Sequence, residues 1–476
     1  MQQYRIIWAK FVHSTHTQTF CFITILVFFC CLLGLATQSI HSLALFWPVN
    51  AILISIFLRF PRYNTPAGWI AAICGYMLAH TATGSHIVTS SALTLANLST
   101  VTSVLILIHA FKINYRHYDK GFTFLKVAAV CGTAGLGGAL FATAVVPSLP
   151  GSLIDEDHQL SAFGLWWSGE IVNCVILIPL MLTFPKWKYW QQQLQNRREI
   201  RIHLLKILPL FAIIISLAVT HLFPGPGTML YPLAALIWAA LTYKLFTISV
   251  INLAIFLLTL HSHQQYLSHI LTDPALNNSI SIRIGISMLV LAPLIVCVIS
   301  GNRQRLFKEI LYLANHDSLT HTLNRRYFFE AAEQFLKQSP KHPFALLMLD
   351  IDYFKKINDT YGHHVGDHVL QHFAHLVSQS MRKQDLFARI GGEEFIVLLA
   401  NTTELEALDI AERIRYSVAA SPLRLVDQDD IYLTVSIGVT LQQDPSAQDL
   451  KDYMVIADFA LYSAKAHGRN QVMVAA

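Results

Sequence analysis

The chain has 476 residues, of which 54% are apolar and only 13% are charged. Soluble proteins usually carry about 25% charged residues, so this composition excludes a wholly water-exposed globule and also a disordered chain. Residues 1–300 hold 16 Lys and Arg with 7 Asp and Glu, whereas residues 301–476 hold 18 and 22. We therefore predict a membrane domain followed by a soluble domain. The net charge of +5 comes from loops beside the predicted spans and does not indicate nucleic-acid binding.

All seven cysteines lie in the apolar part, and none has the paired spacing of a metal site. The sequence therefore predicts neither a disulfide framework nor a zinc site, and a reducing compartment suits the soluble part.

Ten apolar runs in the first part approach the length needed to cross a hydrocarbon core of about 30 Å. They lie at 19–38, 42–59, 66–84, 88–111, 123–147, 161–184, 204–223, 229–243, 246–262 and 282–300. The eighth and ninth are short and are separated only around Lys244, so we expect eight to ten spans. The first run lacks the small-residue cleavage site of a signal peptide and is predicted to be a helix.

The loops between these runs alternate in charge. Those predicted to lie outside, at 85–87, 148–160, 224–228 and 263–281, contain no Lys or Arg, and the second carries the acidic run 155–157. The loops predicted to lie inside are basic. This alternation follows the positive-inside rule and, with an even number of spans, places residues 301–476 in the cytoplasm.

Two segments within the apolar part are informative. Residues 46–50 (FWPVN) open the second span, and residues 166–170 (WWSGE) lie in the sixth. Tryptophans at such positions are typical of an interfacial belt. Placing the carboxylate of Glu170 inside a membrane costs free energy, so we expect this side chain to face a partner or a cavity. A hydrogen-bonded structural acid and a ligand or ion site both remain open, and Glu170 is a candidate sensor residue.

A short segment, 301–315, joins the two parts. Leu306, Ile310 and Leu313 recur at spacings of four and three, which is typical of a short coiled coil or of a packed first helix in the next domain. Both interpretations predict a helical linker that could transmit a signal between dimer partners.

From Asp317 onward the pattern alternates between helices and strands. Strands are predicted at 344–351, 386–390, 395–399 and 431–440, and helices at 324–337, 366–381, 403–419 and 450–466. The first strand is apolar throughout, as in a strand buried on both faces. This pattern predicts an α+β sandwich with a palm-like sheet.

Acidic residues gather at two of these strand ends. Asp350 and Asp352 end the first strand, and Glu393 and Glu394 occupy a predicted hairpin turn. A single exposed acid is usually a solvated surface residue, but neighbouring central strands would bring these four together. Carboxylate oxygens at a strand end are what a Mg²⁺–triphosphate site uses.

Glycines and cations accompany the acids. Gly391 and Gly392 would let the backbone approach phosphates closely. Three cations could bind a polyphosphate: Lys355, and the pair Lys465 and Arg469, which are four residues apart.

These motifs resemble the GGDEF family of diguanylate cyclases. Residues 391–395 form GGEEF, a form of the family signature, and further family motifs lie in order at 317–326, 350–359, 362–367, 436–439 and 457–470. The resemblance implies a cyclase domain over 316–476. Such domains condense two GTP into cyclic di-GMP and two pyrophosphates with Mg²⁺ or Mn²⁺, one GTP on each subunit of a two-fold homodimer.

The resemblance also implies roles for single residues. Asp350, the carbonyl of Ile351 and Glu393 correspond to metal ligands, and Glu394 to a residue that supports the metal or activates the 3′-hydroxyl. Asn358 and Asp367 correspond to the guanine readers. The phosphate and ribose contacts fall on Phe354, Lys355, Gly391, Gly392, Lys465 and Arg469. Tyr353 stands where the family commonly has Phe, which preserves an aromatic ring.

Arg382 and Asp385 form an RxxD sequence shortly before Gly391. At this offset it resembles the inhibitory site at which the family binds its product, cyclic di-GMP. The alternative is a surface ion pair.

The FWPVN segment, the WWSGE helix and the short loops resemble the membrane-associated sensor domain of the first MASE class. This implies a multi-pass protein of the bacterial inner membrane, with a sensor over residues 1–300 that lies in the lipid bilayer and receives an unknown ligand. Two other functions fit the sequence less well. An inactive GGDEF receptor would usually lose a signature acid, a guanine reader or a phosphate cation, all kept here. A transporter with a regulatory tail would be expected to show more internal repeat and more buried polar residues. No EAL-type phosphodiesterase domain is expected.

Overall fold

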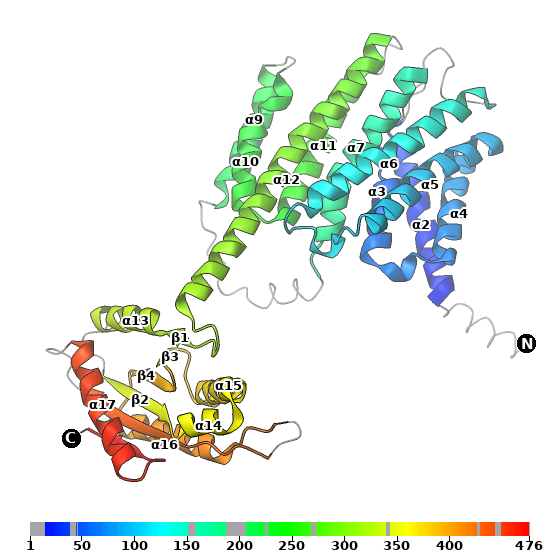
Figure 1. The fold of residues 1–476 in the computed structure, drawn as a ribbon. Coiled ribbons are helices and arrows are strands. Elements are labelled where there is room, and N and C mark those ends of the chain that lie inside the picture. The colour runs from blue at the N-terminus through cyan, green and yellow to red at the C-terminus, as the bar shows by residue number, and fades with distance from the viewer. Residues whose placement is uncertain are drawn as a thin grey trace, which may run out of the picture. The chain divides into compact units, whose positions relative to one another are not determined.

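A computed structural model describes residues 15–38, 44, 46–150, 159–186, 206–223, 227–267, 273–338, 343–425, 429–442 and 449–475. The chain divides into two compact units, Met1–Arg305 and Leu306–Ala476, whose elements are labelled in Figure 1. The acidic run 155–157 and most of the basic loop after residue 186 lie outside the described residues.

The first unit is helical. Its α-helices are α2 (Thr15–Leu35), α3 (Val49–Arg59), α4 (Pro66–Ala82), α5 (Ile87–Ala110), α6 (Thr123–Val145), α7 (Gln159–Thr183), α9 (Leu208–Leu222), α10 (Leu233–Thr242), α11 (Leu245–Leu267) and α12 (Asp273–Asn315). Each predicted span overlaps with one of these helices.

Two predicted boundaries differ from the structure. The second helix begins at Val49 rather than near residue 42, because Pro48 disfavours helical backbone in the residue before it and Trp47 stays outside the helix. The last predicted span and the segment 301–315 form one uninterrupted helix, α12.

Five helices in the described part are long and apolar enough to cross a membrane. They are Thr15–Leu35, Ile87–Ala110, Thr123–Ser148, Gln159–Thr183 and Asn278–Asn315. This number is below the expected eight to ten because several apolar helices, such as α3 with 11 residues, are shorter than a simple span.

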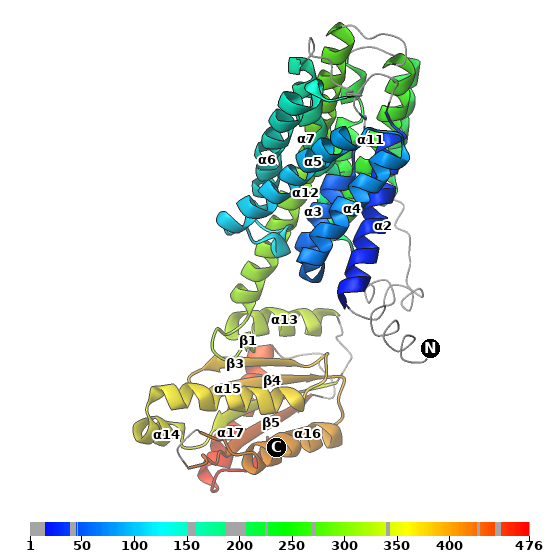
Figure 2. The same cartoon turned by 90° about the vertical axis from the view of Figure 1, so that its right-hand side faces the viewer.

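The helix α3 lies at the centre of this unit. Of its 11 residues, nine are buried, and it packs against α7 and α5. Around it, α2 lies beside α4 (Figure 2), and α5 and α7 both contact α6. The FWPVN segment therefore leads directly into the most buried helix of the unit.

The second unit contains a six-stranded mixed sheet in the order β1-β3-β4-β2-β5-β6. Its strands are β1 (Leu323–Asn324), β2 (Phe344–Ile351), β3 (Leu386–Gly391), β4 (Glu394–Ala400), β5 (Val435–Gln442) and β6 (Val472–Val474). The central strand β2 runs antiparallel to both β4 and β5, while β1 is parallel to β3 and β6 to β5.

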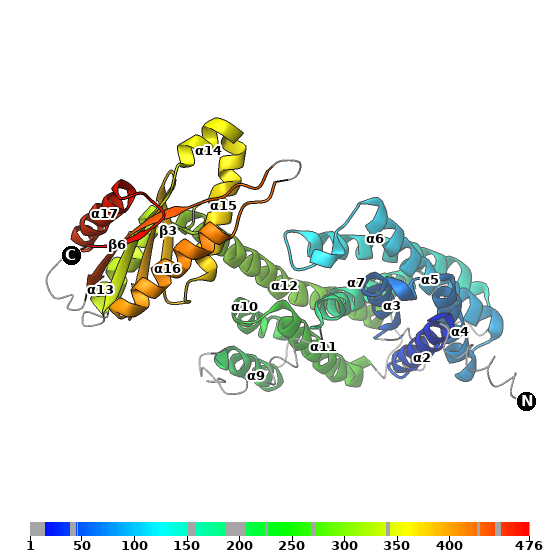
Figure 3. The same cartoon turned by 90° about the horizontal axis from the view of Figure 1, so that it is seen from below.

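Helices cover both faces of this sheet, as Figure 3 shows. They are α13 (Arg325–Gln338), α14 (Phe354–Tyr361), α15 (His363–Gln379), α16 (Glu404–Ala420) and α17 (Leu450–Ala466). Leu347 and Leu349 of β2 pack in one core with α15 and α16, whereas Leu346 and Met348 pack in the other with α13 and α17. Since side chains alternate along a strand, a strand buried on both faces is apolar throughout, as the sequence predicts for β2.

Some elements differ from the prediction. The helix α14 is absent from the sequence prediction, since it has only eight residues and several are polar. The predicted strand at 431–440 begins at Val435 instead, and Ile431 forms an isolated bridge with Leu423. The short strands β1 and β6 are also new.

Candidate functional site

The acidic residues meet at one end of the central strands. Asp350 of β2 lies directly opposite Glu394 of β4 in the antiparallel register. Gly391 pairs with Glu394 across the β3–β4 hairpin, so Gly392 and Glu393 form its turn. The amide of Ile351 donates to the carbonyl of Glu393 at 3.4 Å. Strand pairing thus gathers Asp350, Glu393 and Glu394, and places the Ile351 backbone beside them.

Lys465, near the end of α17, is bound to this cluster. Its Nζ lies 2.6 Å from Oδ2 of Asp350, whose side chain is 8% exposed. Burial raises the pKa of Asp350, the hydrogen bond and charge of Lys465 oppose that rise, and the charges of Glu393 and Glu394 add to it. A buried carboxylate among other carboxylates is stabilised by a cation, and Lys465 supplies one.

The donor set also fits a divalent metal. Carboxylate and carbonyl oxygens are the ligands that Mg²⁺ prefers, and Mg²⁺ is commonly held by one or two carboxylates together with substrate phosphates. Within the described residues no three His, Cys, Asp or Glu side chains are arranged to hold a metal by themselves. A metal at this position would therefore need the Ile351 carbonyl or substrate oxygens beside the acids.

The sequence analysis places Asp352 with the other three acids, but in the structure its side chain binds elsewhere. Its carboxylate is 4% exposed and accepts hydrogen bonds from Thr434 Oγ1 at 2.8 Å, Ser436 Oγ at 2.7 Å and the Asn470 amide at 3.0 Å. Its role is to fix the segment after α17, directly beside Arg469. The donors come from distant parts of the chain, so only the motifs at 436–439 and 457–470, which contain Ser436 and Asn470, could have indicated this role.

Arg469 lies over the ring of Tyr353. The guanidinium carbon is 4.5 Å from the ring centroid, and Nη1 is 3.4 Å from the phenolic oxygen. Arg469, Asn470 and Tyr353 all have left-handed backbone, with φ of 64°, 43° and 56°. Such conformations in residues other than glycine are unusual and cluster at functional sites.

The predicted guanine readers lie on two helices in contact, α14 and α15. Asn358 of α14 reaches over Gly366 of α15, where an added Cβ would stand 1.9 Å from its Oδ1 and 3.3 Å from Cζ of Phe354. Only glycine permits this close approach. Asp367 follows on the same helix and is exposed, as is Lys355 on α14. The structure therefore brings Asn358 against Gly366, the residue that precedes Asp367 in the chain.

A further contact, absent from the sequence analysis, supports the hairpin. Arg389 of β3 donates through Nε to the carbonyl of Gly392 at 2.8 Å, and its Nη1 lies 3.3 Å from Oδ1 of Asp317. Burial alone would raise the pKa of Asp317, but hydrogen bonds from Thr320 and the charge of Arg389 hold it below its usual value. Because α12 ends at Asn315, the pair links the start of this domain to the acidic turn.

Arg382 and Asp385 have partners within their own unit. Asp385 accepts from the Arg382 amide at 2.8 Å and from the Ala400 amide at 3.3 Å, so it stabilises a turn. Nη2 of Arg382 lies 3.7 Å from Oε1 of Glu406, and both side chains are about half exposed. Ala400 and Glu394 are the two ends of β4, about 20 Å apart at 3.4 Å per residue. The structure thus separates the RxxD residues from the acidic cluster.

Glu170 of α7 belongs to a buried polar network. Asn50 Nδ2 donates to Glu170 Oε1 at 2.5 Å and to Asn97 Oδ1 at 2.9 Å, and Tyr76 donates to Asn50. Trp47 Nε1 donates to the same Asn97 oxygen at 2.8 Å. The FWPVN and WWSGE segments therefore meet inside the unit. Trp47 uses its indole N–H there, so an interfacial belt does not account for it.

Comparison with known proteins agrees with these motifs. Residues 314–471 match the family model described as diguanylate cyclase, GGDEF domain. The chain is 28% identical over 454 residues to the probable diguanylate cyclase DgcF of Escherichia coli O157:H7, covering 92% of this chain and 91% of that protein. It is 32% identical over 321 residues to DgcF of Escherichia coli K12, covering 64% of this chain and 95% of that protein.

Solved structures of GGDEF and GGEEF domains match about a third of this chain. The GGDEF domain of DgcB from Caulobacter crescentus, in complex with c-di-GMP, is 32% identical and covers 34% of this chain and 93% of that domain, with a TM-score of 0.33. The active GGEEF domain of a diguanylate cyclase from Vibrio cholerae is 34% identical and covers 32% of this chain and 97% of that domain, with a TM-score of 0.29. From the family model and the coverage of its relatives, the chain belongs to the family of GGDEF-domain diguanylate cyclases.

Proposed function

We propose that the chain is a membrane-bound diguanylate cyclase whose C-terminal domain, 316–476, condenses two GTP into cyclic di-GMP. The observation that carries this proposal is the pairing of Asp350 with Glu394 across adjacent strands, beside Glu393 in the hairpin turn. In each half-reaction a 3′-hydroxyl oxygen of one GTP forms a bond to the α-phosphorus of the other. The bond between that α-phosphorus and the oxygen that bridges to the β-phosphate breaks, and pyrophosphate leaves.

The acids would serve this chemistry in distinct ways. Asp350, the Ile351 carbonyl and Glu393 would hold Mg²⁺ or Mn²⁺, which when bound lowers the pKa of the attacking hydroxyl and offsets charge on the phosphate. Glu394, exposed at the start of β4, would support the metal or accept the proton of the 3′-hydroxyl. Lys465 can move from Asp350 toward a phosphate, since both partners are anionic.

The substrate would lie across the hairpin and α14. Asn358 and Asp367 would bind the guanine edge, an amide and a carboxylate that complement its acceptor and donors. The triphosphate and ribose would be held by Phe354, Lys355, Gly391, Gly392, Lys465 and Arg469. Tyr353 orients Arg469 through the stacking contact, so the family's common Phe would lose a hydrogen bond here but keep the ring.

The N-terminal unit would place the enzyme in the inner membrane. Its helices expose large apolar side chains, among them Phe29, Ile106 and Leu140, each with at least 59% of its surface exposed. Such surfaces suit lipid rather than water. With the basic loops inside, residues 1–300 would form a multi-pass sensor, 301–315 a helical linker, and 316–476 a cytoplasmic cyclase.

Product inhibition would act at the RxxD site. The Arg382 side chain is about half exposed, and among the described residues its guanidinium makes a weak contact with Glu406 that would compete with a ligand. Its planar fork suits a phosphate or a guanine edge. Cyclic di-GMP bound here would lie away from the acids and could restrain domain orientation.

The dimer can be tested with mixed subunits in lipid nanodiscs. Because each subunit presents one GTP, an equal mixture of wild type and the Glu394→Gln variant, combined before reconstitution, should have about one quarter of the activity of the same total amount of wild-type protein. Glu404→Gln, which changes an exposed acid on α16, serves as the matched control and should leave the activity of the mixture unchanged. Retention of half the activity in the Glu394→Gln mixture would show that one subunit acts alone and would overturn the dimeric mechanism.

A further inference from the structure

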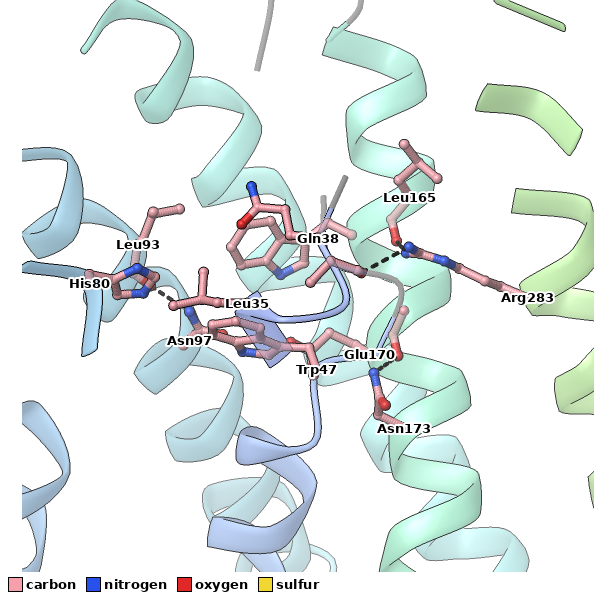
Figure 4. A pocket seen from close by; sticks show the side chains of 13 residues that line it. Leu35, Gln38, Trp47, His80, Leu93, Asn97, Leu165, Glu170, Asn173 and Arg283 are labelled. Atoms are coloured by element: carbon pink, nitrogen blue, oxygen red, sulfur yellow. Dashed lines mark hydrogen bonds between the residues drawn. The ribbon is translucent and has the colours of Figure 1, made fainter. Parts of the chain in front are cut away.

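The helices of the first unit line a partly open cavity with a volume of about 70 Å³. It is lined by side chains from several helices, and Figure 4 shows Glu170 and Asn173 of α7, Arg283 of α12, and Trp47 with His80 around it. Most other lining residues are apolar. The cavity therefore combines an apolar and aromatic wall with a small number of charged and polar groups, as ligand sites do.

The cavity contains an acid and a base that do not bind each other. Glu170 is 5% exposed and Arg283 is 6% exposed, and no ion pair joins them in the described part of the chain. Arg283 instead donates to the carbonyl of Leu165 and, at 3.0 Å, to that of Ala44. Gly169 makes room for it, since an added Cβ would stand 2.9 Å from Nη1. A buried charge without a counter-charge is costly, which favours an occupant that supplies one.

Residues that line the cavity also carry fully buried polar atoms without a hydrogen-bond partner. Within the described residues these include Nε of Arg283, Oδ1 of Asn173 and Nε2 of His80, all on side chains that are nine-tenths or more buried. Two of them have a fixed character, because Arg283 Nε is a donor and the Asn173 oxygen an acceptor. Buried polar groups normally have partners, so the donor requires an acceptor and the acceptor a donor.

The cavity is small, so it suits a compact occupant with few non-hydrogen atoms. The smallest α-amino acids are of this kind. Their carboxylate would meet Arg283, their ammonium would meet Glu170 and Asn173, and a short side chain would lie against Trp47 and His80.

We propose that this cavity binds a small zwitterion, a short-chain α-amino acid, through Arg283 and Glu170. The proposal deepens the sensory role proposed for this unit. Arg283 lies on α12, the helix that continues to Asn315, so binding would act on the segment that leads into the cyclase domain. The test is a binding measurement, so its failure is distinguishable from failure of the cyclase mechanism.

The experiment compares three probes by calorimetric titration of the full-length protein in nanodiscs, up to about 10 mM ligand. L-alanine carries both charges, propionate lacks the amino group, and ethylamine lacks the carboxylate. We expect alanine to bind and each analogue to bind at least about tenfold more weakly, because either analogue leaves a buried polar group unpaired. Absence of alanine binding, or an analogue that binds within tenfold of alanine, would overturn the proposal.

Variants test the assignment of residues. Glu170→Gln preserves shape and the acceptor for Asn50, and should weaken alanine binding about tenfold while leaving propionate binding unchanged. Arg305→Gln removes a cation from the same helix at its exposed ion pair with Asp119, and should not alter binding. Equal loss in both variants, or none in Glu170→Gln, would contradict the site. If Glu170→Gln does not fold, the three probes on the wild type still decide.

Discussion

Replacing Gly366 by alanine should reduce GTP turnover without unfolding the enzyme. The added Cβ would stand 1.9 Å from Oδ1 of Asn358, whereas Cβ atoms essentially never approach below 3.0 Å. The Asn358 amide must therefore move by at least about 1 Å, and a misplacement of that size in a substrate contact costs about 100-fold in rate. We expect kcat/KM for GTP to fall by about that factor.

The free energy of unfolding should change little. Gly366 lies within the helix α15, where alanine is favoured over glycine by about 1 kcal/mol. This gain offsets part of the local rearrangement. A thermal unfolding midpoint close to that of the wild type, combined with the loss of activity, would separate a displaced Asn358 from a damaged fold.

A double-mutant cycle identifies Asn358 as the group that is displaced. If Gly366→Ala acts only through Asn358, then adding it to Asn358→Ala should cost little more, because the clashing atom is already gone. Steady-state release of pyrophosphate with GTP measures all four proteins. Independent losses that multiply in the double variant, or full activity in Gly366→Ala, would refute the reasoning.

Three further predictions concern other residues. Asp352→Ala leaves three donors without their acceptor and should lower the free energy of unfolding by about 3 kcal/mol, whereas Asp352→Asn should lose less; equal midpoints in thermal unfolding would contradict this. Lys465→Met removes a charge that opposes the raised pKa of Asp350, so that pKa should rise further and the acid limb of the kcat/KM profile should move to higher pH. A limb that stays in place would show that Asp350 does not need to ionise. Arg382→Ala should relieve inhibition by cyclic di-GMP while the initial rate stays nearly unchanged, and an unchanged inhibition constant would reduce the RxxD to a surface ion pair.

Much of the second unit can be predicted from sequence because its signals are local. The apolar run of β2 and the helix α17 have the predicted bounds, since burial on both faces and a regular apolar stripe each leave a clear pattern. The helix α14 leaves no such pattern. It begins after Tyr353 in a left-handed conformation, which no residue preference indicates.

The roles of Asp352 and Arg283 cannot be predicted from the sequence, because they depend on tertiary contacts. Asp352 looked like one more acid of the cluster, but its partners Thr434, Ser436 and Asn470 follow it by more than 80 residues. Arg283 likewise appears in the sequence as a single charge in an apolar span. Its position opposite Glu170 in one cavity becomes visible only when α7 and α12 pack together.

The central claim is that the acids at the paired ends of β2 and β4 condense two GTP molecules in this chain. The most direct test incubates the purified full-length protein in lipid with GTP and Mg²⁺ and quantifies cyclic di-GMP and pyrophosphate by chromatography. The account predicts two pyrophosphates for each cyclic di-GMP, no cyclic product from ATP, and no product from Glu393→Gln or Glu394→Gln that is folded as the wild type. Product formation that persists in both variants, or a wild type that forms none with Mg²⁺ or Mn²⁺, would contradict it.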